Sequence, residues 1–315
     1  MSVPAAAAPR RGGLRWRTPH DRRLTQDRRL GYLLVAPVIV LLLAITAYPL
    51  VYNLWNSFRF VNLSYAGLPQ HFVGLSNYHK MVASPEWQAA LERTLGFTVI
   101  TVAADLALAL GLALMLHRKF RGRGLLRAAV LVPWAVPTVV SATLWKTMFD
   151  PRAGFVDYIL GGLHHSWSTI TWVNGSTLRS WVAIFVADSW KNIPFVALIL
   201  LAGLQLIPSD VYEAARMDGA SSWQSFRRIT LPLLKPAIVV AAIFRTLQAF
   251  FVFDVIYILT GGGPGTSTET LSFLNFQTFI NNTDFGYGGA ISVLLVVMAL
   301  VMAAGYVRFL RPETA

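Results

Sequence analysis

Six long apolar stretches constrain this chain more than any other feature of its sequence. The first, Tyr32–Trp55, contains no charged residue. The others are Leu95–Leu116, Leu125–Phe149, Leu178–Ala202, Pro236–Thr260 and Gly289–Phe309. A helix needs about 20 apolar residues to cross the hydrocarbon core of a bilayer, where every backbone polar group must be satisfied internally. We therefore expect an all-α membrane protein with six transmembrane helices.

Composition and charge distribution support a membrane protein and argue against nucleic-acid binding. Only 13% of the residues are charged, whereas a soluble domain carries about 25%, and the absence of cysteine excludes disulfides and thiolate metal sites. The net charge of +12 could suggest nucleic acid. However, 19 of the 27 lysines and arginines fall in the segments that would face the cytoplasm if both termini are inside. By the positive-inside rule the basic charge is a topology signal.

The domain organisation follows from these stretches. Residues 1–29 are rich in alanine and arginine, and we expect a basic, disordered cytoplasmic tail there. Residues 30–315 are expected to form one membrane domain with both termini in the cytoplasm. A polar stretch, residues 209–236, separates the fourth span from the fifth; we call it the 209–236 segment.

Local signals predict two short helices in the 209–236 segment. Ser209 follows a proline and is expected to cap the first helix. Gly219 permits a positive φ and is expected to end that helix. Ser221 and Gln224 have the spacing of a capping box that opens the second helix, which we expect Pro232 to stop. Alternatively, the segment has no functional role and only connects two spans.

The same segment resembles the EAA loop of binding-protein-dependent ABC importer permeases. The matching residues are Glu213, Ala214, Ala215, Asp218, Gly219, Ala220, Phe226, Ile229, Leu231 and Pro232. The first span, residues 74–78 (GLSNY) and the stretch FVFDVIYILTGGGPGTSTET also resemble the first permease of maltose and glycerol-phosphate type carbohydrate importers. The resemblance implies that an ATPase grips this segment, which would be the cytoplasmic coupling loop.

The resemblance also implies a fold, a location, a cargo and a set of partners. The fold would be that of a type I ABC importer permease in the cytoplasmic (inner) membrane, and the cargo a sugar or a sugar-like solute. The partners would be a second, different permease, two ATPase subunits that hold ATP and Mg, and an extracytoplasmic solute-binding protein. The chain itself has no G-x-x-x-x-G-K-[ST] sequence to bind ATP. We expect no catalytic residue, cofactor or metal in it, and thus no enzyme.

Polar residues within the fourth and fifth spans are candidates for the solute path, because ionisable groups in membrane helices are costly and usually face a cavity or a partner. Positions i, i+3, i+4 and i+7 share one helical face, and they are occupied by Asp188, Lys191, Asn192 and Phe195. This face lies beside a helix break expected at Pro194. Arg245, Gln248 and Val252 share a face of the fifth span, with Phe251 adjacent. Alternatively, Asp188 pairs with Lys191 and Arg245 pairs with an acid of the second permease. Asp105 is expected to bond to a neighbouring helix.

Other functions remain open from the sequence alone. The permease could carry a glycerol phosphodiester, an amino acid or a peptide instead of a sugar. An ion-coupled secondary transporter would need internal repeats, and a membrane enzyme would need converging catalytic groups. We find neither pattern in the sequence.

Overall fold

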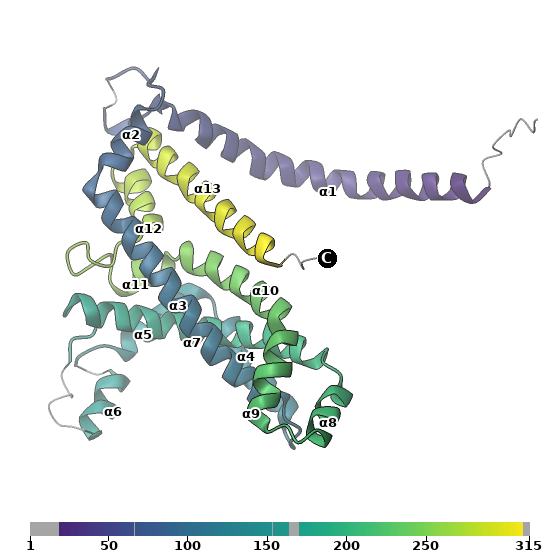
Figure 1. Cartoon of the computed structure of the whole chain (residues 1–315). Coiled ribbons are helices and arrows are strands. Elements are labelled where there is room, and N and C mark those ends of the chain that lie inside the picture. The colour runs from purple at the N-terminus through teal and green to yellow at the C-terminus, as the bar shows by residue number, and fades with distance from the viewer. Residues whose placement is uncertain (1–18, 66, 153, 164–169, 311–315) are drawn as a thin grey trace, which may run out of the picture. The chain divides into compact units, whose positions relative to one another are not determined.

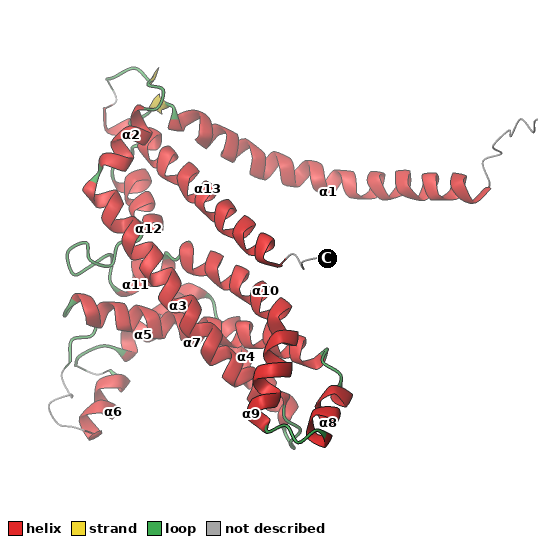
Figure 2. Ribbon diagram, viewed as in Figure 1, coloured by secondary structure: helices red, strands yellow, loops and turns green. Residues whose placement is uncertain are grey.

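Helices make up most of the computed structural model, which describes residues 19–310 except 66, 153 and 164–169 (Figure 2). The chain divides into two compact units, residues 1–52 and 53–315. The first unit holds most of α1 (Pro19–Ser57), whose apolar part, Gly31–Ser57, is long enough to cross a membrane. Because α1 begins at Pro19, the predicted disordered tail is helical over residues 19–29; its first 18 residues lie outside the described part.

A small two-stranded hairpin lies near the start of the second unit. Strand β1 (Arg59–Phe60) pairs antiparallel with β2 (His71–Phe72), and a 3-10 turn, Leu63–Tyr65, lies between them. Helix α2 (Ser76–Ala83) follows. The amide of Asn77 donates hydrogen bonds of 2.9 Å to the carbonyls of Ser57 and Arg59, which fixes the chain at this point.

Three long helices form the centre of the second unit, α3 (Pro85–His117), α7 (Thr177–Gln205) and α10 (Leu231–Phe250). They pack on one another, and Figure 1 shows α3 and α7 side by side. The helices α8 (Ser209–Met217) and α9 (Ser222–Ser225) lie beyond one end of this group. Helix α13 (Phe285–Leu310) packs against α10.

The third predicted span is broken rather than straight. Helix α4 (Arg123–Ala135) and helix α5 (Thr138–Met148) meet at an angle of 91°. The break falls at Val136, which is extended with ψ 132°, because the ring of Pro137 disfavours helical backbone in the residue before it. In the described residues, five helices are long and apolar enough to span a membrane, or six if this bent pair counts as one.

The fifth span begins earlier than the sequence predicts. A π-helical turn, Phe226–Thr230, joins α9 to α10, so helix continues past Pro232 instead of stopping there. Pro232 is the second residue of α10 and directly follows the π-helical turn. The chain then forms α11 (Asp254–Leu259), α12 (Leu271–Phe276) and a π-helical turn, Gln277–Asn281. The short helix α6 (Phe155–Leu163) lies between α5 and α7.

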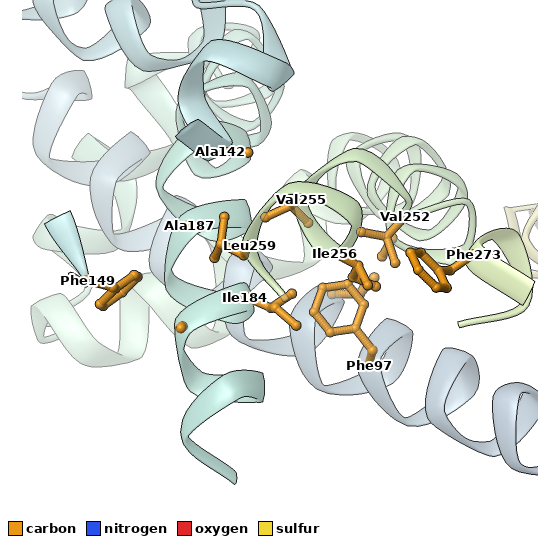
Figure 3. Packing of buried hydrophobic residues seen from close by; sticks show 13 residues of the cluster. Phe97, Ala142, Phe149, Ile184, Ala187, Val252, Val255, Ile256, Leu259 and Phe273 are labelled. Carbon is orange, nitrogen blue, oxygen red and sulfur yellow. The ribbon is translucent and has the colours of Figure 1, made fainter. Parts of the chain in front are cut away.

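Figure 3 shows the hydrophobic cluster at the junction of α3, α5, α7 and α11. Phe97 from α3 lies near Ile184 from α7 and Ile256 from α11, and Ala187 from α7 belongs to the same cluster. Val252, which we expected on the solute path, belongs to this cluster and is only 6% exposed. This core holds the central helices together close to the intramembrane polar residues.

Candidate functional site

The 209–236 segment presents a short exposed helix on a tight turn. Glu213, Ala214 and Asp218 are exposed on α8 and at its end. Gly219 has a φ of +77°, a backbone conformation that glycine adopts without strain. The Ala220 amide then bonds the Ala215 carbonyl at 2.9 Å and closes the turn.

The segment also shows which local signals held. Ser221 and Gln224 form the predicted capping box, with both reciprocal hydrogen bonds present. The prediction for Ser209 was wrong: the residue at the cap position of α8 is Pro208, and the Ser209 hydroxyl bonds the Asp210 carboxylate instead. Tyr212 of α8 bonds Thr230 at 3.1 Å, which ties α8 to the π-helical turn. The remaining matched residues, Phe226, Ile229, Leu231 and Pro232, lie on that turn and at the start of α10.

A second group of residues forms a buried ionic cluster between three helices. Arg245 of α10 is 0% exposed and donates from Nε to Asp105 Oδ2 of α3 at 2.6 Å. Its Nη2 group also pairs with Asp188 of α7. Asn192, one turn along α7, donates to the Asp188 carboxylate at 3.0 Å. The shared guanidinium group thus offsets part of the cost of burying these charges in the membrane.

Lys191 does not join this cluster. Its ammonium group donates to the carbonyl of Trp134 at 3.2 Å and to the carbonyl of Val136. The last carbonyls of a helix lack partners within it, so Lys191 caps α4 at the break between α4 and α5. The predicted alternative pairing of Asp188 with Lys191 is therefore replaced by two separate interactions. Pro194 also behaves differently from our expectation, since α7 continues through it.

An aromatic array lies next to the capped break. Trp134 of α4 stacks on Phe195 of α7 with ring centroids 5.1 Å apart. Phe195 contacts Phe244 of α10 edge-on at 6.2 Å. Phe244 is 50% exposed, and the exposed Gln248 lies one turn further along α10. We call Trp134, Phe195 and Phe244 the aromatic array.

Asp188 and Lys191 are intermediate in burial, and the structure divides the other six predicted path residues into two sets. Phe195, Gln248 and Phe251 belong to partly exposed surface, and Phe251 is 42% exposed. Arg245, Asn192 and Val252 are buried, so Arg245 does not share the exposed face of Gln248. Sequence reasoning missed Trp134 and Phe244. The four-residue spacing from Phe244 to Gln248 was a usable signal for one helical face.

Comparisons with known proteins place this chain in a family. Residues 106–312, more than half of the chain, match the binding-protein-dependent transport system inner membrane component family. The trehalose/maltose transport system permease protein MalF of Thermococcus litoralis is 42% identical over 284 residues, covering 90% of this chain and 94% of that protein. The chain belongs to this permease family.

Further relatives support this family assignment and the fold. The trehalose transport system permease protein SugA of Mycobacterium tuberculosis is 40% identical over 282 residues, which cover 90% of this chain and 89% of the relative. A solved bacterial ABC transporter for import of the acidic polysaccharide alginate has a chain that superimposes with a TM-score of 0.78. The two share 23% identity over 93% of this permease and all of that chain. The fold is that of a type I ABC importer permease.

Membership settles the class of protein. The permease is a multi-pass inner-membrane component of a transport system that depends on a binding protein, and it is a transport subunit rather than an enzyme. The matched region contains the 209–236 segment and the aromatic array. It also contains Asp188 and Arg245, while Asp105 lies one residue before its start.

Proposed function

We propose that this permease translocates a sugar, delivered by an extracytoplasmic binding protein, in an importer driven by ATP. The observation that carries the proposal is the 42% identity, over 90% of the chain, to a trehalose/maltose permease. Two further relatives carry trehalose and sulfoquinovosyl glycerol in their names, at 40% identity each. All three names describe carbohydrates or their derivatives.

The partners in this proposal are a second, different permease, two ATPase subunits and the binding protein. A solved alginate transporter of the same fold was crystallised in complex with a periplasmic protein bound to an alginate pentasaccharide. ATP and Mg would bind only to the ATPase subunits. Both termini of the permease would lie in the cytoplasm, which puts the 209–236 segment on the side of the ATPases.

Coupling would be mechanical. The exposed carboxylate of Glu213 on α8 would anchor the helix in a groove of the ATPase, and the turn at Gly219 would set its angle. Helix continues from Ser222 to Phe250, so a displacement of α9 passes directly into α10. Because α10 carries Phe244 and Gln248, closure of the ATPases would move one wall of the solute path.

The aromatic array would contact the solute. Sugar rings present C–H faces that pack on aromatic rings, while their hydroxyl groups suit an amide such as Gln248. Lys191 and Arg245 are already bonded within the protein, to carbonyls and to two carboxylates. This favours a neutral solute over an anionic one, although a relative at 35% identity is named for sn-glycerol 3-phosphate.

Uptake of labelled sugar tests the proposal. The complete transporter in proteoliposomes, supplied with its binding protein, should accumulate trehalose or maltose in an ATP-dependent manner. Phe244→Ala should reduce that uptake about two- to tenfold, the range expected for one aromatic contact. Phe120→Ala, an exposed ring outside the array, is the matched control and should have no effect. Uptake of an amino acid or peptide but of no sugar would overturn the proposal.

A further inference from the structure

A cationic pocket lies between the 209–236 segment and the ends of two membrane helices. Its volume is about 790 Å³. The end of α3, with His117 and Arg118, and helix α8, with Tyr212 and Arg216, both line it. Trp223 at the start of α9 lines it as well. We call this space the α3–α8 pocket.

The charged residues that line the α3–α8 pocket have one sign. Arg118 and Arg216 line it, and the positive charges of Arg123 and Arg127 act on His117 at its edge. Arg127 is held there by its hydrogen bond of 3.0 Å to the Leu116 carbonyl. The lining residues within the described part of the chain include no aspartate or glutamate. The pocket therefore suits an anion.

The apolar part of the lining restricts the kind of anion. Leu114 of α3 and Leu204 of α7 come from the membrane helices themselves. The rings of Trp223 and Phe226 stack on each other with centroids 5.6 Å apart and add an amphipathic wall. Because α3 ends at His117 and α7 ends at Gln205, the pocket lies where two spans leave the bilayer. Lipid phosphates occupy the same depth, and tryptophan favours it.

We propose that the α3–α8 pocket binds the headgroup of an anionic phospholipid, with phosphate at Arg118 and Arg216 and acyl chains along Leu114. Arginine recognises phosphate well because its guanidinium group can donate two parallel hydrogen bonds. Basic pockets between membrane helices on the cytoplasmic side are known lipid sites. The cytoplasmic placement rests on the orientation in the proposed function.

A lipid in this pocket would connect moving and fixed parts. Its walls belong both to the core helices α3 and α7 and to α8 and α9 of the 209–236 segment. Occupancy would thus favour the position of α8 seen here. The consequence is that anionic lipid content regulates how efficiently ATP hydrolysis drives this permease.

Native mass spectrometry of the full-length chain, purified with its transporter subunits, tests the binding directly. Titration with phosphatidylglycerol should give a defined bound lipid, and phosphatidylcholine should not. The Arg118→Gln/Arg216→Gln variant should weaken phosphatidylglycerol binding by about fivefold for each arginine, the effect of one basic residue at a lipid surface. Lys119→Gln, a change of the same charge at the adjacent exposed residue, should leave binding unchanged.

Further arms separate the possible sources of the anion. Arg118→Lys/Arg216→Lys keeps both charges but loses the paired hydrogen bonds, so its binding should fall between that of the wild type and that of the glutamine variant. Binding above that of the glutamine variant would exclude misfolding as the cause of the loss. Inorganic phosphate should not displace the lipid. The proposal would be overturned if phosphate alone displaced the lipid or if phosphatidylcholine were retained equally. It would also be overturned if the pocket were covered only by the ATPase subunits and held no lipid. Lipid retention is read without transport, so its failure would leave the import function standing.

Discussion

Arg245 and Asp105 form a fully buried ion pair, 2.6 Å from Nε to Oδ2, although 140 residues separate them in the chain. Asp188 shares the same guanidinium group. One arginine thus joins α3, α7 and α10 within the membrane, so the cluster fixes the helices that carry the aromatic array and the exposed face of α10.

Removal of the shared arginine should destabilise the permease strongly. Arg245→Met leaves two carboxylates buried without their partner, and we expect a loss of about 3–5 kcal/mol in the free energy of unfolding. Thermal unfolding in detergent measures it. The triple variant Asp105→Asn, Asp188→Asn, Arg245→Met should recover much of the loss, because no unpaired charge remains. A triple variant less stable than Arg245→Met would contradict this account.

Lys191 should act as a cap for the broken α4–α5 span. Lys191→Met leaves the carbonyls of Trp134 and Val136 without their donor, and we expect a loss of about 1–3 kcal/mol. Lys146→Met removes the same charge from an exposed position on α5 and serves as the control. Equal unfolding temperatures for the two variants would contradict this prediction, because they would show that Lys191 contributes no more to stability than an exposed lysine.

Close packing of α7 on α10 depends on Gly203. A Cβ atom at this residue would lie 2.4 Å from the Cβ of Ala237, a distance that forces the helices apart. Gly203→Ala should therefore lower the unfolding temperature. Gly111→Ala on α3 has open space around it and should be neutral or stabilising by about 0.5–1 kcal/mol. Equal unfolding temperatures for Gly203→Ala and Gly111→Ala would contradict the close contact between α7 and α10.

Glu269, in the loop before α12, should make stability depend on pH. Burial raises the pKa of its carboxyl group, against the opposing effect of Arg93. The folded state then binds the proton more tightly than the unfolded state, so this group's contribution to stability falls as pH rises from the unfolded value through the folded one. Glu269→Gln should stabilise the permease at neutral pH and leave acidic conditions unchanged. Equal effects at both pH values in thermal unfolding would contradict the assignment.

Local signals in the sequence predicted part of the local structure. The predictions of a cap at Ser209, a helix stop at Pro232 and a helix break at Pro194 are wrong. The capping box of Ser221 and Gln224 is confirmed, since both partners lie within one turn, and Gly219 adopts the positive φ expected of it. The long apolar stretches predicted the membrane class because length and composition alone decide that question. The family resemblance, drawn from short motifs, is confirmed over most of the chain.

Long-range partners could not be predicted in the same way. Spacing along α7 put Asp188 and Lys191 on one face, but it carried no information about the helix opposite. In the structure, Asp188 pairs with Arg245, and Lys191 donates hydrogen bonds to carbonyls at the end of α4. The bend at Pro137 was also missed, because a proline in a membrane helix is compatible with either a kink or a break.

The central claim is that ATP hydrolysis by a partner enters this permease through α8. Sugar uptake and ATPase activity, measured together in proteoliposomes of the complete transporter, test it most directly. Glu213→Lys and Gly219→Glu should each abolish ATP-driven uptake while the protein remains in the membrane. Glu92→Lys, a charge reversal on an exposed position of α3, should transport normally. Wild-type uptake by both 209–236 variants would contradict the account.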